Sequence, residues 1–409
     1  MCHFADNRSD RTSSHLRAME ATSKEDDDQN IRHMKRLGVI NALRGLSALA
    51  IVLYHVRLPL WVGWTEISAH PEKYSLIDQA LAYPGAGCHF FGQAVMLFFV
   101  LSGFCIHYPY AGQARLLELK SYAIRRVLRI YPPYFAAVAL SLVATYASYH
   151  YWGLRDPSSE HFLRSFLMTQ NYPPNAGQID INPALWSLPV EMELYLAYPI
   201  FYLCLVRFGL SISIGFALAI TLAGQILRLY SGDEFPYIDW HNFTLYWLTW
   251  CGGAWLAEKL ATNSLPKCGL GWTSAMLIAF GLAICGDSKV FNWFEYEPGR
   301  RLIWGGFFFL LVAWCLQRSP YTEDSSSWTG KALNGLGSIS YSLYLTHYPL
   351  LIICGHLIVG PRLDLAEGKP SNFLVSLGFT AFAIVFATIF YALIERPCHR
   401  WARRLGRST

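Results

Sequence analysis

Long runs of apolar residues, separated by shorter polar stretches, make up most of the chain from about residue 37 onward. A helix needs about 20 predominantly apolar residues to cross the hydrocarbon core of a bilayer. Ten runs approach this length, and we expect each to form a membrane-spanning helix. They lie near residues 37–57, 90–108, 131–151, 185–206, 209–229, 241–260, 268–286, 301–317, 333–357 and 372–394. The fourth and fifth runs are separated only at Arg207, which predicts a helical hairpin.

Polar segments flank these apolar runs. Residues 1–36 are polar, contain an acidic run and show no signal-peptide pattern, which is typical of a disordered segment. We therefore expect a disordered cytoplasmic tail at 1–36, a membrane domain at 37–398 and a basic cytoplasmic tail at 399–409.

Positive charges in the connecting loops orient the predicted spans. The loop 109–130 carries five basic residues and one acid, Glu118, and the segment 396–409 carries arginines without an acid. The loop 58–89, on the other side, contains a single lysine or arginine, Lys73, and Arg57 lies at its edge. Because cytoplasmic loops are enriched in lysine and arginine, both termini are expected in the cytoplasm, which agrees with an even number of spans.

The composition supports a membrane protein. The chain has 409 residues, of which 53% are hydrophobic and 15% are charged, whereas soluble proteins carry about 25% charged residues. The formal net charge of +5 is too small to indicate nucleic-acid binding. The ten cysteines are scattered without a CxxC pair, so neither a disulfide framework nor a metal site is expected. We expect an all-α, multi-pass protein whose partner is the lipid bilayer of the cell membrane, either the inner or the plasma membrane.

The first apolar run carries two ionisable side chains on one helical face. Arg44 and His55 are separated by ten residues, which is about three helical turns or roughly 16 Å, and the offset returns to within about 20° of the same face. Charged groups within a membrane are costly unless they line a polar cavity or find partners. This face therefore marks a candidate functional site.

Five short motifs accompany this pair in a fixed order. They are Phe-Phe-Val-Leu-Ser-Gly-Phe at 98–104, Arg-Arg-Val-Leu-Arg-Ile-Tyr-Pro at 125–132, Trp-Ser-Leu-Pro-Val-Glu at 186–191, Ser-Tyr-Ser-Leu-Tyr-Leu-Thr-His-Tyr-Pro at 340–349 and Ile-Glu-Arg-Pro at 394–397. With these motifs the sequence resembles the acyltransferase 3 family, membrane enzymes that O-acylate polysaccharides, lipopolysaccharide and other exported molecules. The resemblance covers residues 41 to about 398. The chain has Ala94-Val95-Met96 where many members have Gly-x-Asp, and Met192 replaces a second acid, with Glu193 following.

The resemblance implies an acyltransferase that transfers groups other than amino-acyl groups. The donor is expected to be acyl-CoA, the acyl group most often acetyl, and the acceptor a hydroxyl of a glycan or glycolipid. Acyl transfer needs a base for the hydroxyl proton or a nucleophile that holds the acyl group, and a phosphate-rich donor calls for arginine. We expect His55 as the base, with Glu191 at similar depth as its orienting partner. The expected donor-binding residues are Arg44, Arg126 and Arg129. The expected substrate contacts or structural supports are Ser102, Tyr195, Tyr344 and His347.

Each candidate residue also has a structural interpretation. His55 can anchor a helix end, Arg44 can extend its guanidinium group to the lipid headgroups, and Arg126 and Arg129 can simply fix the topology. Glu191 can form a purely structural pair with another charged side chain, such as an arginine. Ser102 beside Gly103 can belong to a helix-packing contact, and His347 can join Ser340 and Tyr344 in a packing network. An alternative from another class is a transporter or exporter that uses the intramembrane charges as a substrate or proton pathway. The absence of an internal repeat in the sequence favours the enzyme. Transfer of a longer acyl or a succinyl group is a second enzymatic alternative.

Overall fold

A computed structural model of the protein describes residues 38–113, 117–153, 158–172, 182–231, 242–287, 297–318, 327–363 and 365–405. All regular secondary structure within these ranges is helical, which confirms the expected all-α class. The expected disordered tail at 1–36 lies outside the described residues.

The chain begins with a first helix, Gly38–Val56. The remaining α-helices are α2 (Trp64–Ala69), α3 (Leu76–Gly87), α4 (Ala94–His107), α5 (Leu119–Trp152), α6 (Ser159–Phe166), α7 (Ser187–Phe208), α8 (Leu210–Ser231), α9 (Trp247–Ala261), α10 (Leu270–Asp287), α11 (Glu297–Arg318), α12 (Trp328–Ser338), α13 (Ser340–Val359), α14 (Leu374–Phe390) and α15 (Arg396–Leu405). Within the described ranges, nine helical segments are long and apolar enough to cross a bilayer. The protein is therefore an all-α, multi-pass membrane protein.

The expected span at 241–260 is the exception in length. Its helix, α9, has 15 residues, which at 1.5 Å per residue is about 22 Å and less than the roughly 30 Å of the hydrocarbon core. α9 nevertheless runs parallel to α4. Near their starts the rings of Phe99 and Tyr246 lie 5.0 Å apart, and near their ends His107 is hydrogen-bonded to Glu258. The chain therefore also passes through the bundle at α9, which is the sixth of the ten expected spans.

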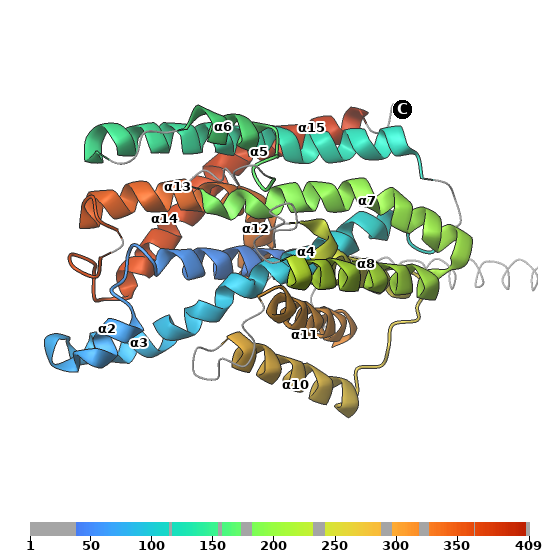
Figure 1. Ribbon diagram of the computed structural model, residues 1–409, viewed down its shortest axis with the longest axis horizontal. Coiled ribbons are helices and arrows are strands. Elements are labelled where there is room, and N and C mark those ends of the chain that lie inside the picture. The colour runs from blue at the N-terminus through green and yellow to red at the C-terminus, as the bar shows by residue number, and fades with distance from the viewer. Residues whose placement is uncertain are drawn as a thin grey trace, which may run out of the picture.

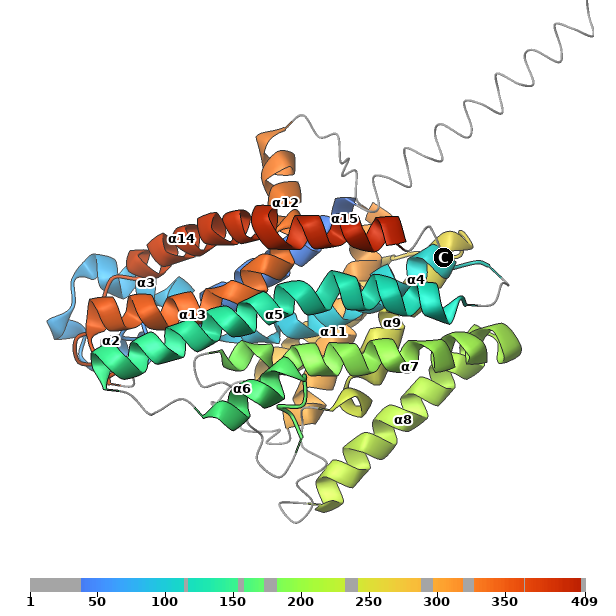
Figure 2. The same cartoon turned by 90° about the horizontal axis from the view of Figure 1, so that it is seen from above.

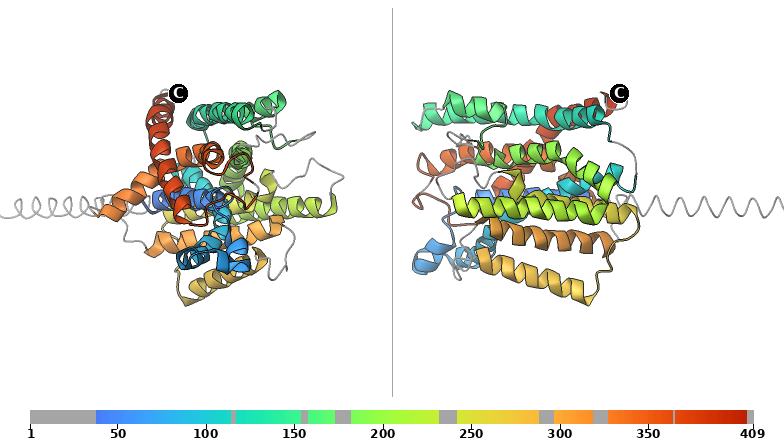
Figure 3. Two further views of the ribbon diagram at one scale, coloured as in Figure 1. Left: turned by 90° about the vertical axis from the view of Figure 1, so that its left-hand side faces the viewer. Right: turned by 45° about the vertical axis from the view of Figure 1, so that its right-hand side comes forward.

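The long helices lie alongside one another in a bundle. Figure 1 shows α5, α6 and α15 along one side and α10 along the opposite side, and the right-hand view of Figure 3 shows α10 as the outermost helix. Large apolar side chains on α10 face outward, with Leu277 61% and Ile278 62% exposed. An extended apolar exterior of this kind suits a helix surrounded by lipid. The first helix begins and α15 ends toward the same end of the bundle (Figure 2).

Three connections differ from the expected pattern. The loop 58–89 contains the helices α2 and α3, and Ser75 caps α3 by accepting a hydrogen bond from the Asp78 backbone N–H. The run 333–357 divides at Ile339 into α12 and α13, and α12 projects from the bundle (Figure 2). The expected tail at 399–409 begins inside α15, which continues to Leu405. Short capping and breaking signals, which a hydropathy reading overlooks, set these boundaries.

The hairpin expected at Arg207 is confirmed. α7 ends at Phe208 and α8 begins at Leu210, so a single residue, Gly209, connects the two helices. Gly209 has a φ of 85°, a left-handed conformation that glycine adopts without steric cost.

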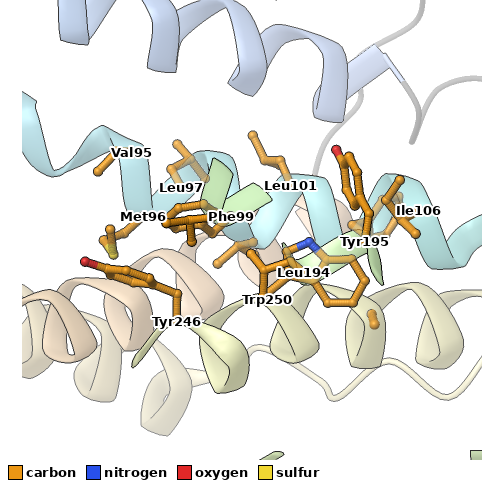
Figure 4. Close-up of a cluster of buried hydrophobic side chains, with 14 of the residues drawn as sticks. Val95, Met96, Leu97, Phe99, Leu101, Ile106, Leu194, Tyr195, Tyr246 and Trp250 are labelled. Atoms are coloured by element: carbon orange, nitrogen blue, oxygen red, sulfur yellow. The ribbon is translucent and has the colours of Figure 1, made fainter. Parts of the chain in front are cut away.

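The closest helix contact in the interior joins α4 to α9. A Cβ atom at Gly103 would overlap the backbone carbonyl of Trp250, and one at Gly253 would overlap the backbone of Val100 and Phe104. Aromatic side chains fill the space around this crossing, as Figure 4 shows for Tyr246 and Trp250. Small residues at such crossings let two backbones approach closely. The close-packing interpretation of Gly103 is therefore confirmed.

We predict that Gly253→Ala destabilises the protein, because the new methyl group can be accommodated only by moving a backbone. Overpacking of this kind costs about 1–3 kcal/mol. The measurement is the thermal unfolding midpoint of the purified protein in detergent, followed by loss of the monodisperse peak in size-exclusion chromatography. Gly281→Ala on α10 is the matched control, since nothing lies within 4 Å of its added Cβ. Equal midpoints for the two variants would contradict the prediction.

Candidate active site

A cavity lies between the first helix, α4, α5, α7, α13 and the turn that precedes α15. It is lined by Arg44, Val95, Phe98, Phe99, Leu101, Ser102, Cys105, Ile106, Arg126, Arg129, Ile130, Ser187, Leu188, Glu191, Tyr195, Tyr341, Tyr344 and Glu395. The cavity volume is about 90 Å³. A single water needs roughly 10–15 Å³ on this measure, so several waters or a narrow acyl-bearing chain can enter.

Three arginines lie near one another on the cavity wall. Arg44 lies near the start of the first helix, and Arg126 and Arg129 lie in the first turns of α5. The guanidinium group of Arg126 also lies over the ring of Tyr122, with its carbon 5.6 Å from the ring centroid, and its Nε has no hydrogen-bond partner among the described residues. The cavity therefore contains guanidinium groups with donor capacity for an anionic ligand.

A buried carboxylate accompanies these arginines. Glu395 is 1% exposed and closes a π-helical turn, Tyr391–Glu395, between α14 and α15. Its carboxylate accepts hydrogen bonds from the backbone N–H (3.1 Å) and hydroxyl (2.5 Å) of Ser342 on α13. Arg44 and Arg129 lie near enough to interact electrostatically with it. Glu395 thus belongs to the cavity wall.

Glu191 organises a second polar group on the cavity wall. Its Oε1 accepts hydrogen bonds from Ser102 Oγ (2.9 Å) on α4 and from the Tyr195 hydroxyl one turn along α7. The indole N–H of Trp250, on α9, donates to Ser102 Oγ (3.2 Å). Hydroxyl donors of this kind stabilise a carboxylate that is removed from bulk water. Glu191 therefore holds Ser102 and Tyr195 in fixed positions on the cavity wall.

The same stripe of α7 connects the cavity to α13. Ser187, one turn before Glu191, contacts the Tyr344 hydroxyl at 2.6 Å. Because that hydroxyl donates its proton to the carbonyl of Ala184 (2.5 Å), Ser187 is the donor in this contact. Ser187, Glu191 and Tyr195 thus form a polar stripe on α7 that faces the cavity.

Two histidines meet beyond Tyr344. The Tyr344 ring centroid lies 5.9 Å from that of His347, one turn further along α13. His347 Nε2 lies 2.9 Å from His55 Nδ1, and the two rings are stacked with centroids 5.1 Å apart. His347 is fully buried, whereas His55 is half-buried and has the ring of Tyr348 5.0 Å away. The pair thus lies next to the cavity wall, without being part of the cavity lining.

The structure brings most of the predicted site residues together. Those that line the cavity are Arg44, Ser102, Arg126, Arg129, Glu191, Tyr195 and Tyr344. The expected contact between His55 and Glu191 is wrong: His55 pairs with His347, and Glu191 pairs with Ser102 and Tyr195. Similar depth in two spans does not determine which helices are neighbours, so the partner was assigned to the wrong helix.

Two contributors to the site were missed from the sequence. Glu395 follows a long apolar run. A charge at the end of a span is costly without a partner, so the argument that identified Arg44 could also have identified Glu395. Trp250 had no such signal, because an indole in an apolar run is usually a packing residue. Within the described ranges, no group of three or more histidine, cysteine, aspartate or glutamate side chains is placed to hold a metal ion.

Three curated relatives resemble the chain over most of its length. The peptidoglycan O-acetyltransferase OatA of Listeria monocytogenes is 24% identical over 383 residues, covering 88% of this chain and 55% of OatA. YrhL of Bacillus subtilis is 25% identical over 354 residues, covering 79% of this chain and 50% of YrhL. The O-acetyltransferase PaAT-1 of Phomopsis amygdali is 24% identical over 414 residues, covering 86% and 80%. The chain spans about half the length of these two bacterial relatives.

No solved structure matches the chain significantly. The family model described as an acyltransferase domain matches residues 37–392, which include the first helix, all the cavity-forming helices and both histidines. The chain therefore belongs to the acyltransferase 3 family.

Proposed function

We propose that the protein is a membrane O-acetyltransferase that moves an acetyl group from acetyl-CoA to a hydroxyl of a glycan or glycolipid. The observation that carries the proposal is the cavity, whose lining combines three arginines with Tyr344, a residue that lies next to the histidine pair. The acyl-bearing arm of a donor is narrow enough to enter such a space, and the arginines suit the phosphates of its head.

The donor binds through its phosphates. Arg44, Arg126 and Arg129 place three guanidinium groups in one cavity against the carboxylates of Glu191 and Glu395. Guanidinium groups bind phosphate oxygens in a bidentate geometry and stay charged at all relevant pH values. The head of the donor therefore lies at the arginines, and its thioester extends along α4 toward Tyr344.

The histidine pair performs the proton chemistry. A neutral imidazole at His55 accepts the hydroxyl proton of the acceptor while the hydroxyl oxygen attacks the thioester carbonyl carbon. The carbon–sulfur bond then breaks, and the sulfur takes up the proton, leaving an ester and a thiol. His55 is half-buried, so an acceptor can approach it more readily than it can approach the fully buried His347.

The acceptor class rests on the relatives. One of them is named a peptidoglycan O-acetyltransferase, and peptidoglycan is a glycan that lies outside the cell membrane. The charge pattern of the loops supports a topology in which the His55 end of the first helix lies on that side of the membrane. We therefore propose an exported or cell-surface glycan or glycolipid as acceptor.

The proposal is tested with purified protein in lipid vesicles, acetyl-CoA labelled in the acetyl group, and an extract of cell-surface glycans. Label in an alkali-labile ester on the glycan supports it, with vesicles lacking the protein as the blank. Label carried into the vesicle lumen without a covalent product would establish a transporter. The same assay with succinyl-CoA and longer acyl-CoA donors identifies the acyl group.

We predict that Arg126→Ala combined with Arg129→Ala raises the apparent KM for acetyl-CoA at least about tenfold, because each charge-assisted contact is worth roughly 1.5–3 kcal/mol. The KM for the acceptor changes much less. Arg125→Ala is the matched control: its guanidinium group binds Ser121 Oγ (2.5 Å) and the Tyr110 hydroxyl (2.8 Å) and does not line the cavity. Unchanged donor kinetics in the correctly inserted double variant would reduce the two arginines to topology anchors.

We predict that His55→Ala lowers kcat by about 10² or more, the usual scale of general acid–base catalysis. Glu191→Gln lowers it through Ser102 and Tyr195 rather than through His55. The two losses should therefore multiply in the double variant, because residues without shared partners act independently. Single-turnover rates of the four proteins measure this coupling. A double variant no slower than His55→Ala would show that the two residues act as a unit.

A further inference from the structure

The ring of His347 is held in one orientation by the backbone of its own helix. Its Nδ1 lies 2.8 Å from the carbonyl oxygen of Tyr344 and 3.1 Å from that of Leu343. A carbonyl oxygen only accepts hydrogen bonds, so Nδ1 of His347 carries the proton. In the neutral ring, Nε2 of His347 is then an acceptor.

This assignment extends to the second ring. Nε2 of His347 lies 2.9 Å from Nδ1 of His55, and one of these two nitrogens has to donate. Because Nε2 of His347 has no proton to give, Nδ1 of His55 is the donor. The neutral ring of His55 therefore has its free lone pair on Nε2, and the bond that one ring nitrogen makes decides what the other can do.

We propose that His347 is a positioning residue that fixes the tautomer of His55, so that Nε2 of His55 is the atom that takes the proton of the acceptor hydroxyl. The inference rests on the proposed acyl transfer for its chemical meaning. The proton moves from the hydroxyl oxygen to Nε2 as the oxygen–carbon bond forms, and it moves on to the sulfur as the carbon–sulfur bond breaks. Throughout, Nδ1 of His55 keeps its proton and its hydrogen bond to His347.

The surroundings of the pair support a fixed arrangement. The first helix contacts the end of α12 and the middle of α13. Asn41 Nδ2 donates to the carbonyl of Asn334 (3.2 Å), and fourteen residues after Asn41, His55 meets His347. Between these two contacts, a Cβ at Gly45 would fall 2.7 Å from the backbone nitrogen of Gly337. The close approach of the two helices thus sets the distance between the rings.

Three variants separate the tautomer role from packing. His347→Gln retains both functions, since the amide nitrogen can donate to the backbone carbonyls while the amide oxygen accepts from Nδ1 of His55. His347→Leu retains bulk but removes the acceptor. His356→Leu is the matched control: His356 lies on the same helix and also contacts a carbonyl through Nδ1, that of Gly360 at 2.9 Å, and it lies over two helical turns from His347.

The first readout is the tautomer itself, measured by ¹⁵N NMR of histidine-labelled protein in lipid, with the His55 signals assigned by their loss in His55→Gln. We expect a protonated Nδ1 and an unprotonated Nε2 at His55 in the wild type, in His347→Gln and in His356→Leu. In His347→Leu we expect the Nε2-protonated form to appear. A wild-type His55 protonated at Nε2 would overturn the inference whether or not the protein transfers acetyl groups.

The second readout is kcat with labelled acetyl-CoA. His347→Leu should lose at least about tenfold, a part of the 10²–10⁴-fold that a general base contributes, with little change in the donor KM. His347→Gln should recover most of the loss, and His356→Leu should match the wild type. If His347→Leu and His347→Gln lose equally, His347 has only a packing role. A protein inactive on every acceptor would reject the proposed function and still leave the tautomer measurement to decide this inference.

Discussion

The low dielectric of the bilayer interior is the constraint on which the rest of this structure depends. An ionisable side chain within a span is costly unless it meets another polar group, so such groups gather in the interior of the bundle. Here Arg44, Glu191 and Glu395 come from three separate segments and face one cavity, while the outer face of α10 is apolar. Because a charge exposed to lipid is destabilising, the folded arrangement that brings these side chains together in the cavity is favoured.

The helix packing supplies the rigidity that these polar contacts need. Gly103 and Gly253 allow α4 and α9 to approach until their backbones are in contact, which fixes Ser102 and Trp250 relative to each other. A hydrogen-bonded network placed on such a crossing has little freedom to rearrange. The short helix α9, which is too short to count as an ordinary span, is thus central to the site because of its position beside α4.

The sequence predicted what depends on composition and order, and it failed where the outcome depends on which helices are neighbours. Apolar runs gave the helical class, and the cost of buried charge identified Arg44 and Glu191. The pairing of His55 with His347 joins residues 292 positions apart, and no periodicity within either run encodes it. The indole of Trp250 gave no signal either, because its hydrogen bond exists only once α4 and α9 have met.

The π-helical turn at Tyr391–Glu395 changes the register of the last transmembrane segment. Along α14 the buried positions step from Ala383 to Ala387, and across the π-helical turn they step from Phe390 to Glu395, five residues on. One extra residue rotates everything that follows by about 100° around the helix axis. An uninterrupted helix would place Glu395 about one residue out of phase, toward the lipid side on which Leu393 is 71% exposed. The carboxylate of Glu395 faces the interior because the π-helical turn adds one residue to the helix at that point. The number of residues in this segment therefore determines which side chains face the cavity, just as their chemical types do.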